Sequence, residues 1–319
     1  MAPPRASAAS RKGIPERDVC AGLLARRGDC CVWDQVRNAP ADGGNVDEAR
    51  HPIQFVRAAN TRKGARRAMT HLTYGGCYAA FYGTGPPVQV PFVERLARSF
   101  DLAGDLRVLD IGCGTGRLLT PLAALGWHVV GMDPQVENLA EARKVADLGA
   151  GAVEIIAGGF AELDDIEAFD IVVAVGDPWW YLLTPEGRGD ALSRVHRALR
   201  PGGAVVLDGP NFEWILNHYR QPEPSEALVD GTLVRRVPLH DIDRLGGTWS
   251  HTDTFSAPDT GEQLTMVHRF AFIRLEEVLS SLREAGFDCV NWYSSWASRA
   301  PRGPEGPRVI AVGRRPRET

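Results

Sequence analysis

Short apolar runs alternate with amphipathic stretches between residues 88 and 209 of the chain. Apolar positions at helical spacing predict helices, and short runs rich in β-branched residues predict strands. The expected strands are LRVLDI, WHVVGMD, AVEIIAG, FDIVVAVG and GAVVLDG. The expected helices are VPFVERLARSF, RLLTPLAALG, PQVENLAEARKVADLG and TPEGRGDALSRVHRALR. This alternation with short links predicts an α/β fold with a doubly wound, mostly parallel sheet.

Two of the expected helices carry boundary signals. Pro134 suits a first helical turn, where its missing N–H is not needed. Thr184 is an expected N-cap followed by Pro185, and Gly202 follows the end of that helix.

The alternation ends after the fifth expected strand. Residues 212–273 hold one short helical run, FEWILNHYR, and then the strand-like runs TLVRRVPL, GTWSHTDTF and QLTMVHRFAFI. They predict a β-rich lobe inserted after the fifth strand. The helix LEEVLSSLREAG and two more strand-like runs, FDCVNWYSSW and RVIAVGRR, follow the lobe and bring the main sheet to seven strands.

The first 68 residues show no sustained helical or strand period. They carry 13 Lys or Arg and 7 Asp or Glu, so the formal charge of −4 leaves about −10 for residues 69–319. We expect residues 1–68 to be a disordered basic tail, or the product of a mis-called start with the native product beginning near Met69. Residues 69–319 are the expected folded domain.

Composition excludes several classes of function. The acidic charge of residues 69–319 argues against a surface that follows the phosphates of nucleic acid. No apolar run approaches the ~20 residues of a membrane span, and the first residues lack the apolar core of a secretory signal. The six cysteines show no CxxC pairing, which argues against a disulfide framework or a metal site. We therefore expect a cytoplasmic protein without a metal that binds neither nucleic acid nor membrane.

The stretch VLDIGCGTGR, residues 108–117, places Gly112, Gly114 and Gly116 directly after an expected strand. Bare backbone lets a ligand approach closely, and the amides that open the next helix can face its polar atoms. A dinucleotide would require GxGxxG, but Arg117 stands where the third glycine belongs.

Two carboxylates favour a different ligand at this loop. Asp110 precedes the glycines and suits an ammonium group, whereas Asp133 ends the next expected strand and suits the two hydroxyls of a ribose. An amino acid joined to a nucleoside without phosphates meets both demands, and S-adenosylmethionine is such a compound.

These motifs together resemble the class I S-adenosylmethionine-dependent methyltransferases. VLDIGCGTGR is similar to the family's first motif, and VVGMDPQVENLAEAR, FDIVVAVG and LRPGGAVVLDG follow in the family's order. The resemblance implies a Rossmann-like seven-stranded sheet ending in an antiparallel pair, with the loop at the methionine part of the cofactor and Asp133 on the ribose. The implied cofactor-binding residues are Tyr82, Asp110, Gly112, Cys113, Gly114, Gly116, Asp133, Pro134, Phe160 and Gly176.

The chain departs from the family pattern after the third expected strand. Gly159 stands where many members carry an aspartate for the adenine amine, so Phe160 or Glu162 is expected to meet the base.

Tyr78 and Tyr82 lie four residues apart, on one expected helical face. They resemble the N-terminal tyrosine pair that covers the cofactor in small-molecule methyltransferases, which would bring Tyr78 to the substrate. The alternative is that both rings pack the helix on the core.

The run DPWWY, residues 177–181, follows the fourth expected strand. It superficially resembles the motif of amino-directed nucleic-acid and protein methyltransferases, but Trp179 stands where the second proline should be. We expect Trp179 and Trp180 to give the acceptor an apolar wall, and core packing is the alternative.

The expected lobe brings candidate acceptor residues. Trp214 and Arg235 are expected to bind a small organic acceptor, because aromatic walls with a few polar groups suit such ligands. His251 with Asp253, or His240, is the candidate general base for a hydroxyl acceptor. The predicted function is transfer of a methyl group from S-adenosylmethionine to a hydroxyl or amine of a small-molecule metabolite. The alternatives are an RNA or protein methyltransferase and a cofactor-binding protein without turnover.

Overall fold

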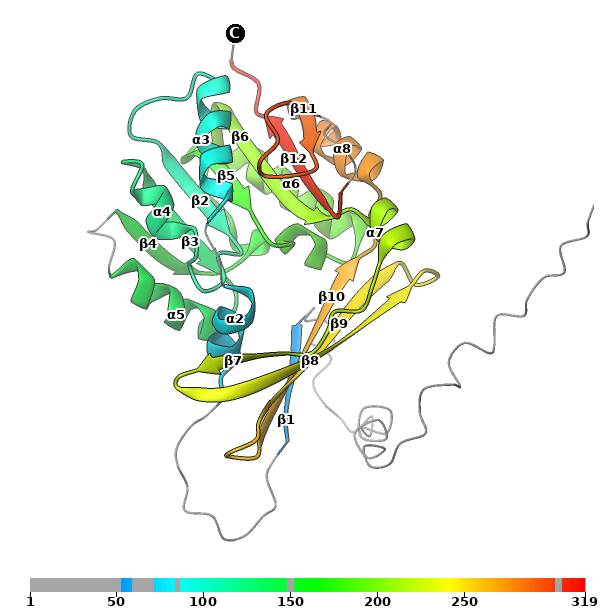
Figure 1. The fold of residues 1–319 in the computed structure, drawn as a ribbon. Helices are drawn as coiled ribbons and strands as arrows, with labels where there is room; N and C mark the ends of the chain where they lie inside the picture. The colour runs from blue at the N-terminus through cyan, green and yellow to red at the C-terminus, as the bar shows by residue number, and fades with distance from the viewer. Residues whose placement is uncertain (1–52, 59–71, 84–86, 148–151, 302–305, 319) are drawn as a thin grey trace, which may run out of the picture. The chain divides into compact units, whose positions relative to one another are not determined.

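The main body of the chain is a seven-stranded sheet with helices on both faces (Figure 1). A computed structural model of the protein describes residues 53–58, 72–83, 87–147, 152–301 and 306–318. In these ranges the strand order is β11-β12-β6-β5-β2-β3-β4. The strands are β2 (Arg107–Ile111), β3 (His128–Asp133), β4 (Val153–Ala157), β5 (Phe169–Ala174), β6 (Leu199–Pro210), β11 (Asp288–Tyr293) and β12 (Arg308–Arg314). The pairs from β4 to β6 are parallel, and β12 and β11 close the sheet antiparallel. The predicted fold class is confirmed.

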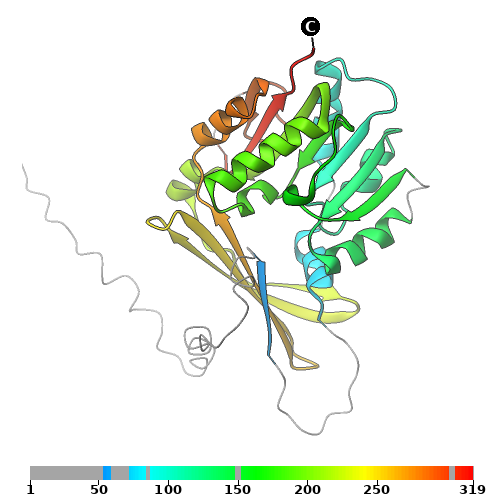
Figure 2. The same ribbon diagram turned by 180° about the vertical axis from the view of Figure 1, so that it is seen from behind.

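Helices cover the two faces of this sheet because its strands are apolar on both sides. One face bears α3 (Gln89–Ser99), α4 (Leu119–Ala123) and α5 (Val136–Ala146), and the other bears α6 (Pro185–Ala198) and α8 (Leu275–Glu284) (Figures 1 and 2). Along β2, Val108 packs in the buried cluster under α3, α4 and α5, and Leu109 packs in the cluster under α6 and α8. This alternation follows from the two-residue period of a strand.

The two boundary signals had different outcomes. Thr184 caps α6, and its side chain accepts the N–H of Gly187 at 3.1 Å. Pro134 does not open α5, which begins at Val136. The reason is that Asp133 Oδ1 accepts the N–H of Gln135 at 2.9 Å, and this hydrogen bond keeps the segment from Asp133 to Gln135 in a turn.

The expected lobe is an antiparallel sheet, which has five strands in the described part of the chain, in the order β1-β10-β9-β8-β7. Its strands are β1 (Ile53–Ala58), β7 (Ser225–Val229), β8 (Thr232–Asp243), β9 (Thr248–Ala257) and β10 (Glu262–Ala271), and α7 (Phe212–His218) precedes it. The helix α2 (Tyr74–Tyr82) packs on this sheet through Tyr74 and Cys77, which share a buried cluster with Phe255 and Leu264.

Strand β1 corrects the expectation for the N-terminal segment. Residues 53–58 pair with β10 over the whole length of β1, from Ile53 opposite His268 to Ala58 opposite Gln263. Six residues are too few to show a clear period, and their hydrogen-bond partners lie about 200 residues further along the chain. The rest of the expected tail, and Met69 as the start of the product, lie outside the described residues.

The helices of the described ranges include none with the length and apolar character that a membrane crossing needs.

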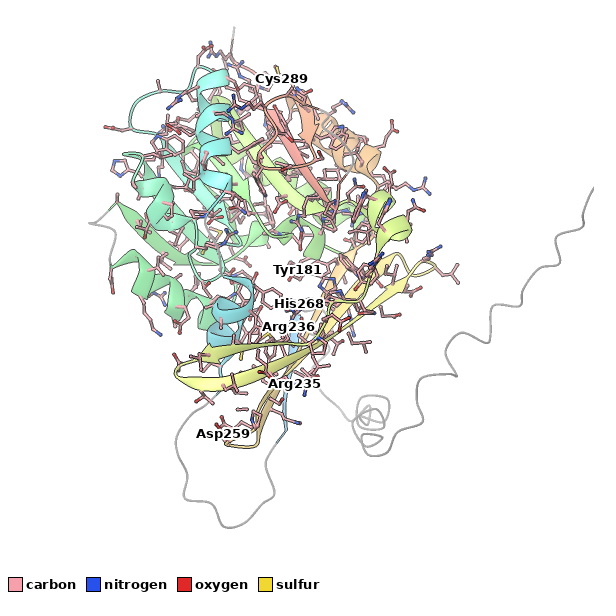
Figure 3. The ribbon with its side chains drawn as sticks, in the orientation of Figure 1. Tyr181, Arg235, Arg236, Asp259, His268 and Cys289 are labelled. Carbon is pink, nitrogen blue, oxygen red and sulfur yellow. The ribbon has the colours of Figure 1, made fainter. Side chains whose placement is uncertain are left out.

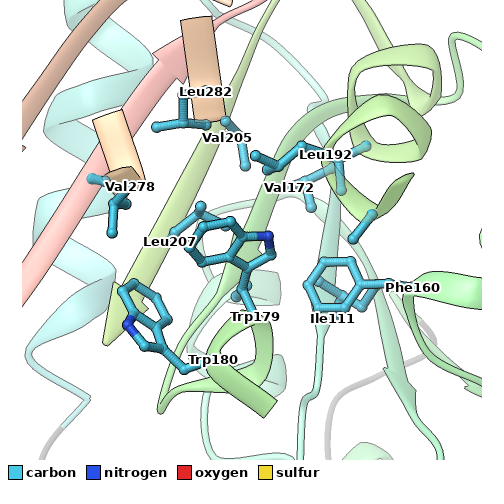
Figure 4. Packing of buried hydrophobic residues seen from close by; sticks show 14 of the residues in the cluster. Ile111, Phe160, Val172, Trp179, Trp180, Leu192, Val205, Leu207, Val278 and Leu282 are labelled. Carbon is cyan, nitrogen blue, oxygen red and sulfur yellow. The ribbon is translucent and has the colours of Figure 1, made fainter. Parts of the chain in front are cut away.

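Trp179 and Trp180 fill the core beneath α6 (Figure 4). They lie in η3 (Pro178–Tyr181), are fully buried, and meet edge to face with ring centroids 5.2 Å apart. A Cβ added at Gly209 of β6 would lie 2.3 Å from the Trp180 ring. The absence of a side chain at Gly209 therefore makes room for the indole.

Replacing Gly209 by Ala is expected to lower the free energy of unfolding by about 1–3 kcal/mol, because the core must shift to admit one methyl group. Urea denaturation measures this difference. Gly189→Ala is the matched control: nothing lies within 4 Å of an added Cβ at this position in α6, so stability should rise by about 0.5–1 kcal/mol. Equal effects of the two substitutions would contradict this account of the core.

Candidate active site

The glycine loop joins β2 to α4 through backbone conformations that other residues rarely adopt. Gly112, Gly114 and Gly116 have φ values of 74°, 56° and 85°. An added Cβ at Gly112 would lie 2.5 Å from the Pro178 ring. The loop is held to the next strand because the N–H groups of Gly112 and Cys113 both donate to the carbonyl of Met132, at 2.7 and 3.0 Å. Glycine at position 112 is therefore required both by φ and by the close approach of Pro178.

Asp133 ends β3 and faces this loop. Its Oδ2 accepts the N–H of Gly114 at 2.9 Å, and its Oδ1 accepts those of Gln135 at 2.9 Å and of the Asn138 amide at 3.4 Å. A carboxylate offers about four lone-pair positions. Oδ2 therefore retains a lone pair that can accept a hydrogen bond from a hydroxyl group of a ligand. Burial raises the pKa of the Asp133 carboxyl group.

Asp110 lies in β2, two residues before Gly112, and is 2% exposed. Burial raises the pKa of its carboxyl group to about 7, with a smaller contribution in the same direction from Asp133 and an opposing one from Arg117. A nearby cationic group would stabilise the ionised form, so this carboxyl group is suited to an ammonium ligand.

The predicted cofactor residues meet at one edge of the sheet, because the carboxyl ends of parallel strands lie together. The loop follows β2, Asp133 and Pro134 follow β3, Phe160 follows β4, and Gly176 follows β5. Phe160 is mostly buried in the core, and Glu162 accepts the N–H of Gly159 at 2.8 Å. Cys113 is buried, and burial raises the pKa of its thiol group.

Arg308 forms an ion-pair network beside Gly176 that the sequence analysis missed. Its guanidinium group contacts Asp208 at 2.6 Å and Asp177 at 2.8 Å. Asp208 also accepts the N–H of Gly176 at 3.0 Å. Asp177 adopts a φ of 77°, which is rare for a residue with a side chain. No motif connects Arg308 with the DPWWY run, since Arg308 lies 131 positions after Asp177 in the sequence (308 − 177).

The helix α2 carries three tyrosines on one face. Tyr78 stacks with Tyr74 at a ring separation of 5.8 Å and contacts Tyr82 at 5.0 Å. An added Cβ at Gly114 would lie 3.4 Å from Tyr78 Cε1. The predicted helical pair is confirmed: Tyr78 faces the glycine loop, and the Tyr82 hydroxyl faces Asp253 of the lobe.

Asp253 connects the lobe to α2. Its Oδ2 accepts a short hydrogen bond from the Tyr82 hydroxyl, and its Oδ1 accepts one from Arg236 Nε at 2.7 Å. Arg236 also lies over the Tyr82 ring, 4.9 Å from its centroid. Asp253 has 0% exposure, and both of its oxygens have partners, so its carboxylate holds α2 against the lobe rather than meeting an acceptor.

Arg235 does not face the site, contrary to the expectation (Figure 3). Residues alternate along β8 between an exposed face, with Arg235 and Val237, and an inner face, with Val234, Arg236 and Pro238. A one-residue shift in a strand reverses the face, and the sequence alone did not show which face is inner.

Three histidines lie on this inner face. His240 and His251 stack in parallel with centroids 3.7 Å apart, and His268 Nδ1 shares a hydrogen bond of 2.8 Å with the Tyr181 hydroxyl. The Nε2 atoms of all three are buried without a hydrogen-bond partner among the described residues. A buried polar atom without a partner costs about 1–3 kcal/mol. Burial lowers the pKa of His251 to about 2 and those of His240 and His268 to about 4.

Two further acceptor candidates are placed differently from the expectation. Trp179 and Trp180 present no surface to a ligand, because both indoles lie in the core. Trp214 is half-buried on α7 and stacks on His218 with ring centroids 4.5 Å apart.

Comparisons with known proteins agree with this geometry. A protein-family model described as a methyltransferase domain matches residues 108–203. The ubiquinone biosynthesis O-methyltransferase of Bradyrhizobium sp. (strain ORS 278) is 37% identical over 121 residues, which cover 38% of this chain and 46% of that protein. The chain thus spans about half the length of the ubiquinone-biosynthesis relatives that it matches.

More of the chain is matched by a putative methyltransferase of Geobacillus sp. (strain WCH70). It is 32% identical over 229 residues, covering 70% of this chain and 90% of that protein. Among solved structures, the CcbJ methyltransferase of Streptomyces caelestis shares the fold at a TM-score of 0.59 and 24% identity, over 72% of this chain and 97% of its own. The sugar N-methyltransferase KedS8 of Streptoalloteichus sp. shares it at 0.60 and 19% identity, over 82% and 99%. By its glycine loop, its strand order and the extent of these matches, the chain belongs to the class I S-adenosylmethionine-dependent methyltransferases.

Proposed function

We propose that the protein transfers the methyl group of S-adenosylmethionine to a hydroxyl or amine of a small-molecule acceptor. The observation that carries the proposal is the glycine loop held by Asp133 at the end of β3, with the buried carboxyl group of Asp110 in the strand that leads into the loop. The inner face of the lobe, with its histidines and aromatic rings, lies against the helix whose Tyr78 meets the loop.

The residues of the loop fit this cofactor. Asp133 Oδ2 would accept a ribose hydroxyl, Asp110 would pair with the ammonium group, and the bare backbone at Gly114 would admit the methionine part beneath Tyr78. The bound cofactor supplies an electrophilic methyl group on a sulfonium. Phe160 is nearly enclosed by the core, so we assign it to packing beside the adenine position.

The chain's own contribution is mainly to hold the acceptor atom in line with the methyl group of the cofactor and to keep water out of the site. Orientation of two bound reactants supplies much of the acceleration in such bimolecular steps. A hydroxyl acceptor must also lose a proton, and a neutral imidazole can accept it. We assign this role to a buried histidine of the lobe's inner face, and a supporting role to Asp253, which holds that face against α2 through Tyr82.

A small-molecule acceptor is favoured over a nucleic acid or a protein. Both indoles of the DPWWY run lie in the core, so neither is available to stack on a base. The matched relatives from Bradyrhizobium are named O-methyltransferases of ubiquinone biosynthesis, and KedS8 is titled a sugar N-methyltransferase. These names support a small acceptor and leave both oxygen and nitrogen open.

Thermal denaturation with S-adenosylmethionine and with S-adenosylhomocysteine tests the proposal. Either compound should raise the melting temperature, since a ligand that binds only the folded state stabilises it. Lack of a shift with both compounds would remove the methyltransferase function and the alternative of a cofactor-binding protein together. Incubation with labelled cofactor and a metabolite mixture, followed by mass analysis, then separates turnover from binding.

Asp133→Ala should weaken binding of S-adenosylhomocysteine at least tenfold, because it removes the ribose partner and the acceptor for Gly114 N–H. His251→Ala, in the lobe, should change that affinity less than twofold but slow methyl transfer at least tenfold. Calorimetry and an initial-rate assay separate the two effects. Equal losses of affinity in both variants would contradict the assignment.

Asp110 should make stability and binding depend on pH in opposite directions. Its carboxyl pKa is raised by burial from 3.8 to about 7, so its contribution to stability is complete below pH ~4 and is lost as the pH rises through 7. That contribution is at most about 4 kcal/mol. Ligand binding needs the ionised form, so affinity for S-adenosylhomocysteine should rise about three- to tenfold from pH 6 to pH 8.

The control for this pH dependence is Asp110→Asn. Arg117 and Asp133 face the same carboxyl group and are retained in the variant, so the two proteins differ only in the titratable group at position 110. Calorimetry at several pH values should find the rise in affinity in the native protein and a flat profile in the variant. The same slope in both would show that another group is responsible.

A further inference from the structure

His240, His251 and His268 form a row across the lobe, which we call the imidazole row. His240 of β8 pairs with His251 of β9, and His251 pairs with His268 of β10. Side chains at paired positions in neighbouring strands point to the same face. The three rings therefore lie side by side on the inner face, although 28 residues of sequence separate the first from the last.

The rings of the imidazole row are held in defined orientations. Tyr219 shares a hydrogen bond of 2.5 Å with His240 Nδ1, and Tyr181 shares one of 2.8 Å with His268 Nδ1. His251, in the middle, stacks on His240 and meets Trp249 edge to face at 4.0 Å. Tyrosines thus occupy one nitrogen of each outer ring and leave its Nε2 to another partner.

The part of the chain that the structure describes offers the row no such partner. The Nε2 atoms of His240, His251 and His268 are buried and make no hydrogen bond to any residue of the described ranges. His268 is only 4% exposed. Apolar residues flank the row on one side, where Trp249 of β9 pairs with Ile242 of β8 and with Phe270 of β10. Three adjacent polar nitrogens left without partners in such surroundings mark a ligand surface more readily than a packing layer.

The row is uncharged, and the charges next to it neutralise each other. Arg236 and Asp253 both influence the imidazoles, but they form an ion pair at 2.7 Å. Burial lowers the histidine pKa values to about 4 or less, so the rings are neutral at physiological pH. Neutral imidazoles hydrogen-bond to hydroxyl and uncharged amino groups, whereas a carboxylate or phosphate buried beside them would lack the opposite charge that offsets its desolvation.

The two ends of the row differ in their distance from the glycine loop. Three tyrosines surround His268: its ring centroid lies 6.3 Å from that of Tyr74, 6.5 Å from Tyr82 and 6.0 Å from Tyr181. Tyr74 and Tyr82 flank Tyr78 on α2, and Tyr78 meets the loop at Gly114. His240 lies at the opposite end, where it shares a hydrogen bond with Tyr219. His268 is therefore the member of the row closest to the cofactor side.

We infer that the imidazole row is the acceptor-binding surface and that it takes a non-acidic compound with several hydroxyl or amino groups along one edge. His268 contacts the group that receives the methyl, and His251 and His240 bind groups further along the same edge. This assignment rests on the proposed methyltransferase function, and it adds the chemical class of the acceptor and a contact residue, His268, that no motif identifies.

Ion exchange of a metabolite mixture tests the class of the acceptor. The mixture is passed over an anion exchanger at neutral pH, and the flow-through and the retained acidic fraction are each incubated with enzyme and S-adenosyl[methyl-13C]methionine. The labelled product should come from the flow-through, and its mass spectrum should show several hydroxyl or amino groups. A labelled product from the acidic fraction alone overturns the proposal.

Variants test the role of His268 in the same assay. His268→Phe should lower the rate of labelling at least tenfold, and His268→Gln, which keeps a hydrogen-bonding group, should retain at least threefold more activity than the Phe variant. The matched control is His128→Phe at the exposed start of β3, which should leave the rate within twofold of the native protein. An unchanged rate in His268→Phe overturns the assignment.

Calorimetry with S-adenosylhomocysteine separates this proposal from the one on which it rests. All three variants should bind it within twofold of the native affinity, which also shows that they are folded. Binding by the native protein without any labelled product from the flow-through overturns the acceptor assignment alone. Absence of binding by the native protein contradicts the methyltransferase function itself.

Discussion

The hydrogen bonds between the end of β3 and the loop after β2 are the constraint on which the site depends. The carbonyl of Met132 receives two loop N–H groups, and the carboxylate of Asp133 receives the N–H of Gly114. These bonds require the loop to pass through left-handed backbone conformations, which glycine adopts without strain. Asp110 and Asp133 lie near the ends of the two neighbouring strands that these bonds connect. A carboxylate that shapes the loop and keeps a lone pair for a ribose hydroxyl thus combines structure and binding in one side chain.

A second constraint comes from the way the lobe joins the rest of the protein. Its inner face is apolar near α2, through Phe255 and Leu264, and apolar again near α7, through Trp249 and Phe270. The polar side chains lie between these two contacts. Packing at both ends therefore holds the imidazole row in position without using the imidazoles themselves, and the buried ion pair of Asp253 with Arg236 secures the Tyr82 end.

The expectations that were wrong have a common physical origin. Trp179 and Trp180 follow a strand that leads to the ligand edge, but the chain turns there into η3 and directs both indoles into the core. Arg235 and Arg236 are adjacent in sequence, and only the pairing of β8 with β9 decides which of them faces inward. Strand β1 was missed because its partner, β10, is supplied by a distant segment. Each error concerns a direction or a partner that local sequence does not encode.

The sequence by itself determined the seven-stranded fold, the glycine loop, the two carboxylates and the helical tyrosine pair. Their signals are local: apolar periodicity, residues that permit unusual backbone angles, and polar side chains at strand ends. Only the tertiary structure decided that Asp253 pairs with Tyr82 and Arg236, that Arg308 binds Asp177 and Asp208, and that three histidines form one row. Such groupings depend on strand register and on contacts across many residues, since cross-strand pairing brings together side chains that no spacing along the chain connects.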